Sequence, residues 1–255
     1  MTERLDRELV RRGLARSRSH ARAMINAGQV MVEGSVVERP GERVAASAAI
    51  HAPDDRYVSR GAHKLIGALE DLQLSVAGRA LDAGASTGGF TQVLLARGCH
   101  EVIAVDVGSG QLAPVLRADP RVRLHEQTNL RDLRLDDVGG VAVDLVVADV
   151  SFISLRLLVG PLVSVTRDDG WVLLLVKPQF EVGRELLGKG GVVRAPADQL
   201  QAISSVIAAV GEHGWHGVDA VPSRLHGASG NREFFVLLRR TESAPNLDLT
   251  ALVQR

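Results

Sequence analysis

The chain of 255 residues is poor in the features that mark secreted, metal-binding and membrane-spanning proteins. Its single cysteine, Cys99, cannot form an internal disulfide and supplies no zinc site, which suits a reducing compartment. The N-terminus carries arginines and acids instead of a secretory signal, and the most apolar runs are too short to cross a bilayer. We therefore expect a cytoplasmic protein with no membrane span and no bound metal.

Lysine is scarce in a chain that otherwise has ample positive charge. Of the 30 basic residues only Lys64, Lys177 and Lys189 are lysines, so arginine stands wherever charge alone is needed. Lys64 and Lys177 therefore look like positions that require an amine. The formal net charge is zero, which argues against uniform coating by nucleic acid, yet residues 1–22 hold seven arginines against three acids.

The first part of the chain has the pattern of a small α+β module. Apolar residues at helical spacing predict two short helices between Arg4 and Ile25, with a break around Gly13. A hairpin around the Glu33-Gly34 turn follows. An alanine-rich stretch then predicts a linker, or a last strand that runs into one. We place the module at residues 1–47 and the linker at residues 48–59.

Residues 60–240 alternate between apolar, strand-like runs and helical stretches, and residues 241–255 form a C-terminal tail. Strands are expected near residues 80–83, 101–105, 122–125, 143–148, 171–176, 217–221 and 234–239. This order is typical of a doubly wound, mostly parallel α/β sheet of the Rossmann-like type. No helix separates the last two runs, so the last strand should insert antiparallel, as in methyltransferases and not in dehydrogenases.

The turn after the first of these strands predicts a site for S-adenosylmethionine. Its glycines let the backbone turn tightly against a ligand, and its hydroxyls and helix N–H groups can hold the methionine end. A dinucleotide loop would read G-x-G-x-x-G, and Gly84-Ala85-Ser86 lacks the second glycine, which argues against NAD. The predicted cofactor-binding residues are Asp82, Gly84, Ser86, Thr87, Gly88, Gly89, Phe90, Asp106, Asn129 and Asp149.

Two members of this set have specific predicted partners. Asp106 ends the second strand, where a carboxylate can accept both hydroxyls of an adenosine ribose; an ordinary strand-end acid is the alternative. Asn129, after the third strand, is a candidate for the adenine edge, or else a turn former.

Four residues predict a proton-transfer site at the carboxyl edge of the sheet. Methylation of a ribose 2′-hydroxyl needs a base that takes the proton as the new bond forms. Lys177 emerges from a buried strand and is the predicted base, because arginine cannot be deprotonated usefully. Lys64 can supply a nearby like charge that favours the neutral form of Lys177, or orient the hydroxyl. Asp149 and Glu233 would position the two amines; each alone is as ordinary as any strand-end acid.

The arginine-rich N-terminus predicts a surface for folded RNA. Its charge is not interleaved with aromatic residues, which favours recognition of RNA shape and backbone over stacking on single-stranded bases. A solvated, charged helix face is the alternative. Arg60 lies one helical turn before Lys64 and can link the RNA to the active site. The predicted RNA-binding residues are Arg4, Arg11, Arg12, Arg16, Arg18, His20, Arg22 and Arg60.

Several motifs together resemble the TlyA family of ribosomal RNA 2′-O-methyltransferases, often labelled haemolysins. These motifs are Arg4-Leu5-Asp6, Leu14 to Ser19, Tyr57 to Leu65, Leu81 to Phe90, Asp149 to Ser154, Val176 to Glu181 and Gly230 to Phe235. The resemblance implies an S4 RNA-binding domain before an FtsJ/RrmJ-like catalytic domain. It also implies a catalytic tetrad of Lys64, Asp149, Lys177 and Glu233, with S-adenosylmethionine as methyl donor.

The implied substrates are cytidines of ribosomal RNA within the ribosomal subunits, in 23S RNA and, as a second candidate, in 16S RNA. Two other functions stay open on the residues alone. One is a non-catalytic RNA-binding assembly factor, which the glycine turn and the intact tetrad oppose. The other is a membrane-active cytolysin, for which no apolar span or amphipathic cationic helix is found.

Overall fold

Two units make up the computed structural model, Met1–Val58 and Ser59–Arg255, which are described separately. The structure describes residues 2–15, 17–52, 57–227 and 229–254. None of the helices in these ranges is long and apolar enough to cross a membrane.

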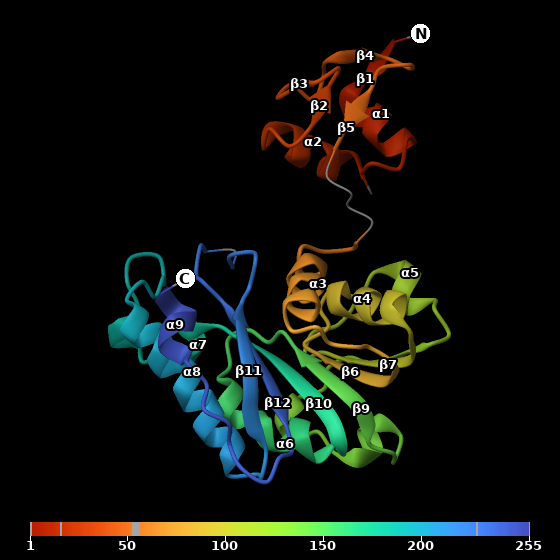
Figure 1. The fold of residues 1–255 in the computed structure, drawn as a ribbon. Coiled ribbons are helices and arrows are strands. Elements are labelled where there is room, and N and C mark those ends of the chain that lie inside the picture. Colours follow the sequence, from red (N-terminus) through yellow and green to blue (C-terminus); the bar gives the residue numbers. More distant parts are fainter. Residues whose placement is uncertain (1, 16, 53–56, 228, 255) are drawn as a thin grey trace. The chain divides into compact units, whose positions relative to one another are not determined.

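The first unit packs two helices against short strands (Figure 1). Its elements are α1 (Leu5–Arg11), α2 (Arg18–Asn26), β1 (Thr2–Arg4), β2 (Met31–Val32), β3 (Ser35–Val36), β4 (Arg43–Ala45) and β5 (Ile50–His51). Strand β1 pairs with β4, and β2 lies between β3 and β5, all antiparallel. The Ser17 hydroxyl caps α2 by accepting a hydrogen bond from His20 N at 3.2 Å. Leu5, Leu9 and Ile25 are fully buried in the core of this unit.

The second unit is built on a seven-stranded sheet with the order β11-β12-β10-β9-β6-β7-β8. The strands are β6 (Gly78–Ala83), β7 (Cys99–Val105), β8 (Val122–His125), β9 (Val143–Ala148), β10 (Thr166–Val176), β11 (His216–Pro222) and β12 (Phe234–Arg239). The five strands from β10 to β8 are parallel, and β12 runs antiparallel to both of its neighbours. The expected doubly wound α/β sheet with an antiparallel last strand is therefore confirmed.

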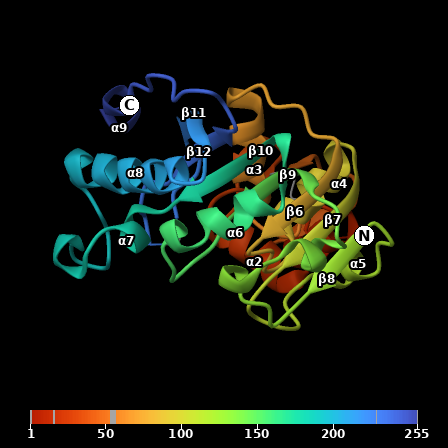
Figure 2. The same cartoon turned by 90° about the horizontal axis from the view of Figure 1, so that it is seen from below.

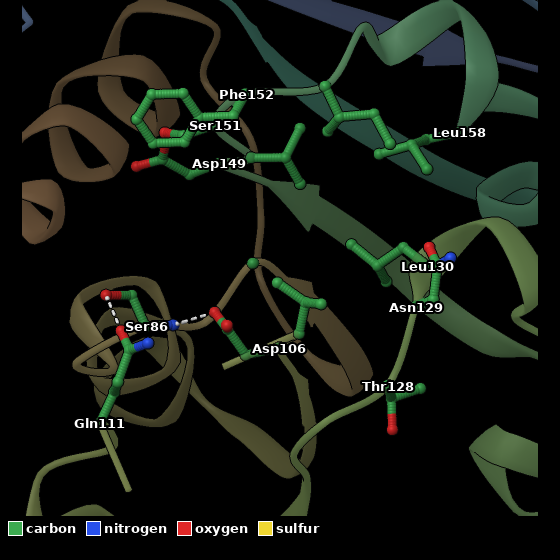
Figure 3. Close-up of a pocket in the computed structure, with 14 residues that line it drawn as sticks. Ser86, Asp106, Gln111, Thr128, Asn129, Leu130, Asp149, Ser151, Phe152 and Leu158 are labelled. Carbon is green, nitrogen blue, oxygen red and sulfur yellow. Dashed lines mark hydrogen bonds between the residues drawn. The ribbon is translucent and has the colours of Figure 1, made fainter. Parts of the chain in front are cut away.

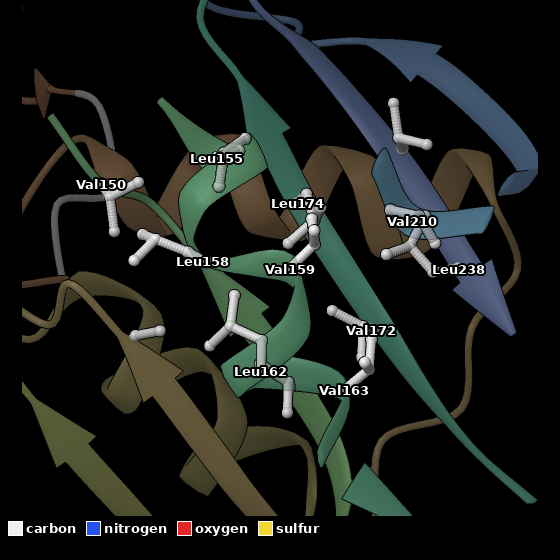
Figure 4. Packing of buried hydrophobic residues seen from close by; sticks show 14 of the residues in the cluster. Val150, Leu155, Leu158, Val159, Leu162, Val163, Val172, Leu174, Val210 and Leu238 are labelled. Atoms are coloured by element: carbon white, nitrogen blue, oxygen red, sulfur yellow. The ribbon is translucent and has the colours of Figure 1, made fainter. Parts of the chain in front are cut away.

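Helices cover both faces of this sheet (Figures 1 and 2). They are α3 (Gly61–Asp71), α4 (Gly89–Arg97), α5 (Pro114–Arg117), α6 (Val159–Ser164), α7 (Pro178–Glu181), α8 (Pro196–Gly211) and α9 (Leu249–Gln254), with the 3₁₀ turns η1 (Leu130–Asp132), η2 (Leu135–Val138), η3 (Leu155–Leu157) and η4 (Arg184–Leu186). Figure 4 shows the core between the sheet and α6 and α8, where Leu162, Leu174, Val210 and Leu238 are buried. Near-continuous apolar runs such as that of β10 suit strands buried on both faces.

The register of the sheet gathers several strand ends at one edge. Ala83 of β6 lies opposite Val105 of β7 and Ala148 of β9, so these three strands finish side by side. Val176, the last residue of β10, lies opposite Phe234, the first residue of β12. Residues that follow β6, β7, β9 and β10, or precede β12, therefore meet at this edge, where open α/β sheets bind ligands.

Candidate active site

The first feature at this edge is an ion pair between Lys177 and Asp149. Each residue directly follows a buried strand, β10 and β9 respectively, and these strands are parallel neighbours. Lys177 Nζ lies 2.6 Å from Asp149 Oδ1, and both side chains are largely buried. Asp149 Oδ1 has no hydrogen-bond partner among the described residues. We call it the strand-end ion pair.

A second ion pair joins Lys64 to Glu233. Lys64 lies in the first turn of α3, and Glu233 directly precedes β12, which pairs with β10. Lys64 Nζ donates a hydrogen bond to Glu233 Oε2 at 2.6 Å, and the glutamate side chain is only 3% exposed. We call it the helix ion pair. The structure thus places the four residues predicted as a tetrad in two lysine–carboxylate pairs.

Two cavities adjoin these ion pairs. A large cavity of about 550 Å³ lies among the loops after β6, β7, β8 and β9 (Figure 3). A small cavity of about 310 Å³ is lined by Lys64, Lys177 and Asp149, among others. The two cavities share four lining residues, Gly84, Ser86, Asp149 and Ser151. Both lysines therefore line a cavity that shares part of its wall with the large cavity.

The loop between β6 and α4 has the backbone that its glycines predict. Gly84 and Gly88 have φ angles of +88° and +94°. A Cβ at Gly84 would lie 2.6 Å from the carbonyl oxygen of Asp149, so the close approach of this loop to β9 requires glycine. Ser86 N donates to Asp106 Oδ2 at 2.8 Å, which ties the loop to the end of β7 (Figure 3).

The predicted cofactor-binding residues fall into three groups. Gly84, Ser86, Asp106, Asn129 and Asp149 line the large cavity. Thr87, Gly89 and Phe90 line the small cavity only, and Phe90 also stacks on Phe235 with ring centroids 6.2 Å apart. Asp82 and Gly88 line neither cavity. Asn129 caps η1 by accepting a hydrogen bond from Arg131 N at 3.1 Å, so its oxygen has a structural role as well.

Asp82 lies beneath the glycine loop, without exposure to solvent. Its Oδ2 accepts a hydrogen bond from the Thr91 hydroxyl at 2.6 Å, whereas Oδ1 has no partner among the described residues. Burial raises the pKa of Asp82 to about 7, because the charged form loses its hydration.

The families and structures that this chain resembles agree with the fold described above. The model of the FtsJ-like methyltransferase family matches residues 57–240, and that of the S4 domain matches residues 3–50. The chain belongs to the FtsJ-like methyltransferase family. Solved methyltransferases of low identity share the fold, such as one from Listeria monocytogenes with a TM-score of 0.52 at 14% identity, covering 72% of this chain and all of the other.

Other relatives have higher sequence identity. A Mycobacterium tuberculosis protein named 16S/23S rRNA (cytidine-2′-O)-methyltransferase TlyA is 51% identical over 240 residues, covering 92% of this chain and 89% of the relative. A Campylobacter jejuni protein named 23S rRNA (cytidine-2′-O)-methyltransferase TlyA is 36% identical, covering 70% of this chain and 69% of the relative. The solved structure of a candidate hemolysin of Streptococcus thermophilus has a TM-score of 0.78 at 37% identity, covering 99% of this chain and 94% of the other.

In the S4 domain, two buried acids organise most of the predicted RNA-binding arginines. Asp6 accepts hydrogen bonds from Arg4 and Arg18, and Glu8 accepts them from Arg11 and Arg12. Hydrogen bonds from Arg4 and Arg11 respectively lower the pKa of Asp6 and of Glu8 to about 2. Four guanidinium groups against two carboxylates leave a surplus of positive charge held in fixed positions.

The other predicted RNA-binding residues differ in their surroundings. Arg12 is only 22% exposed and donates to the carbonyl oxygen of Ala48 at 2.7 Å, so it also holds the loop after β4. Arg22 is exposed on α2 and His20 is half-buried there, whereas Arg60 lines the small cavity of the FtsJ-like domain. Arg16 lies outside the described residues.

Some residues at the cavities were not predicted as site residues from the sequence. Ser151 lines both cavities and His226 lines the small one, whereas Gln111 accepts a hydrogen bond from the Ser86 hydroxyl at 3.2 Å. Ser151 lies two residues after the strand-end acid Asp149, and this spacing was a usable signal. Gln111 and His226 lie in irregular loops, where no periodicity marks which side chains return to the sheet edge.

Proposed function

We propose that this protein transfers a methyl group from S-adenosylmethionine to the 2′-hydroxyl of cytidines in ribosomal RNA, with Lys177 as the general base. One observation carries the proposal: the lysines of both ion pairs line a small cavity that shares part of its wall with the large cavity at the glycine loop. The names of the relatives that match most of the chain support the reaction and the substrate. With ribosomal RNA as the substrate, we propose that the protein acts in the cytoplasm.

The residues that line the large cavity support S-adenosylmethionine as the cofactor. Gly84 lines this cavity and contributes no side chain that would fill it. The two carboxylate oxygens of Asp106 accept hydrogen bonds from the backbone N–H groups of Ser86 and Gly108, and each oxygen retains a lone pair for a ribose hydroxyl. Asn129 and Leu130 line the cavity where the adenine would lie.

When bound, S-adenosylmethionine supplies a methyl group on a positively charged sulfur, which keeps the electron pair of the broken carbon–sulfur bond as the carbon–oxygen bond forms. Lys177 in its neutral form takes the proton of the attacking hydroxyl at Nζ. Asp149 stabilises the ammonium that results, because the carboxylate lies 2.6 Å from Nζ. Lys64, held by Glu233, provides a second cation in the small cavity that can orient the ribose.

The S4 domain supplies RNA affinity through arginines that the buried acids hold in place. Phosphate contacts of this kind position RNA without reading its bases, so the choice of nucleotide depends on RNA shape and on access to the small cavity. We propose that both 23S and 16S RNA are substrates, as the name of the relative with 51% identity indicates.

Labelled S-adenosylmethionine and separated ribosomal subunits test the proposal. A methylated 2′-oxygen cannot take part in alkaline cleavage, so each modified cytidine should appear as a new position of resistance. Lys177→Arg should abolish transfer while cofactor binding is retained, because arginine keeps the charge but cannot act as a base.

Lys189→Arg provides the matched control, since Lys189 is exposed and lines neither of the two cavities. Transfer by Lys177→Arg at the rate of the control would remove Lys177 from the role of base. Wild-type protein that binds the cofactor and RNA but leaves both subunits unmodified would instead support a non-catalytic assembly factor.

A further inference from the structure

The amine of Lys177 has two polar neighbours that act differently. Asp149 Oδ1 forms an ion pair with Nζ at 2.6 Å and has no hydrogen-bond partner among the described residues. Ser151 Oγ is 2.9 Å from Nζ, and Nζ donates a hydrogen bond to it. Asp149 therefore acts on the amine through its negative charge, whereas the hydrogen bond to Ser151 restrains the orientation of the amine.

A general base needs its lone pair in a defined direction. A lysine amine is tetrahedral, with one bond to carbon and three other positions. Rotation about the last carbon–nitrogen bond exchanges these positions freely unless an acceptor holds one of them. Misdirection of a reacting group by about 1 Å can cost on the order of 100-fold in rate.

Ser151 lies where it can hold the amine beside both reactants. It lines the large cavity and the small cavity, and so does Asp149 (Figure 3). Its own hydroxyl hydrogen is free to rotate, so the oxygen can accept from Lys177 in both the charged and the neutral form of the amine. Asp149, in contrast, faces the amine with a carboxylate oxygen that has no hydrogen-bond partner among the described residues.

We propose that Ser151 is a positioning residue that fixes the rotation of the Lys177 amine, so that the lone pair forms toward the target hydroxyl. With one N–H held by Ser151 and a second side of the nitrogen facing Asp149, one position is left for the substrate. This inference rests on the proposed function, since it assigns Ser151 a part in the same proton transfer.

Because the chain has only three lysines, one experiment can test the inference without relying on activity. In protein labelled with ¹⁵N at lysine Nζ, the Lys177 signal is assigned by its loss in Lys177→Arg. The hydrogen bond to Ser151 should slow exchange of the ammonium hydrogens with water. Ser151→Ala should speed that exchange for Lys177 and leave Lys64 and Lys189 unchanged.

Measurements of kcat and KM distinguish a positioning role of Ser151 from a structural role. Ser151→Ala should lower kcat by about 10- to 100-fold, with KM for RNA and the affinity for S-adenosylmethionine within about threefold of wild type. Ser151→Thr, which keeps the hydroxyl, should restore most of the loss. Ser164→Ala removes an exposed hydroxyl that donates to the Pro161 carbonyl and serves as the control.

Unchanged ammonium exchange at Lys177 in Ser151→Ala would overturn the inference, whether or not the wild type transfers methyl groups. Equal loss of kcat, cofactor affinity and thermal stability in that variant would also overturn it, because it would indicate a structural role. A wild type that shows the Ser151-dependent exchange but no transfer to either subunit would contradict the proposed function alone.

Discussion

Asp82 should make the second unit less stable as the pH rises toward neutrality. The carboxyl group is fully buried, and one of its oxygens has no hydrogen-bond partner among the described residues. Burial raises its pKa to about 7, against 3.8 for an aspartate in water. Between these two values the folded protein keeps a proton that the unfolded chain releases.

The sign and size of the effect follow from this difference. Where the folded state binds more protons, the free energy of unfolding falls as the pH rises, and it levels off above the folded pKa. A difference of about three pKa units corresponds to a total of about 4 kcal/mol. About 2 to 3 kcal/mol of this should be lost between about pH 5 and about pH 8.

Asp82→Asn removes the titration but keeps an oxygen that can accept from the Thr91 hydroxyl. Urea unfolding followed by tryptophan fluorescence reports the second unit alone, because both tryptophans, Trp171 and Trp215, are buried there. From about pH 5 to about pH 8, the wild type should lose about 2 to 3 kcal/mol of unfolding free energy relative to Asp82→Asn. If the two proteins lose stability in parallel over this range, the reasoning about Asp82 is wrong.

Two further predictions concern the glycine loop and the S4 domain. Gly84→Ala should weaken binding of S-adenosylmethionine in calorimetry by roughly tenfold or more, because its Cβ would meet the Asp149 carbonyl; Gly140→Ala, with a similar φ but no neighbour within 4 Å, should bind normally. Asp6→Asn should destabilise the S4 domain in circular dichroism at neutral pH. Asp6 contributes stability above its unfolded pKa of about 4 that is lost as the pH falls toward 2, so wild type and variant should converge there.

The sheet could be predicted because most of its strands show a local hydrophobic pattern in the sequence. Strands β8, β9 and β12 lie at the expected residues, and the missing helix before β12 predicted its antiparallel direction. The pairing of β1 with β4 could not be predicted in the same way. Each strand has three residues, with charged side chains among them, and the pairing joins Thr2 to Ala45 across the whole S4 domain. Local periodicity holds no information on such a contact.

The sequence predicted which residues of the candidate site lie at one edge of the sheet, but not which of them contact one another. Strand ends placed Asp149 and Lys177 at one edge, since parallel strands finish together. Which carboxylate meets which lysine depends on where α3 lies over the sheet, and no pattern in α3 specifies that. The burial of Asp6 and Glu8 could not be predicted either, because acids beside arginines in a helix are ordinarily solvated.

A third group of charges lies at the far end of α3. Arg224, in the segment between β11 and β12, donates to Glu70 at 2.7 Å and to Asp71 at 2.6 Å. It reaches them by crossing α3 over Gly67, where a Cβ would lie 2.8 Å from the arginine side chain. The segment that supplies Glu233 to the helix ion pair is thus fastened to α3 at both ends of the helix. The ion pairs of Arg224 are partly exposed and each contributes little on its own, whereas the hydrogen bond between Lys64 and Glu233, which joins residues 169 positions apart in sequence, is largely buried.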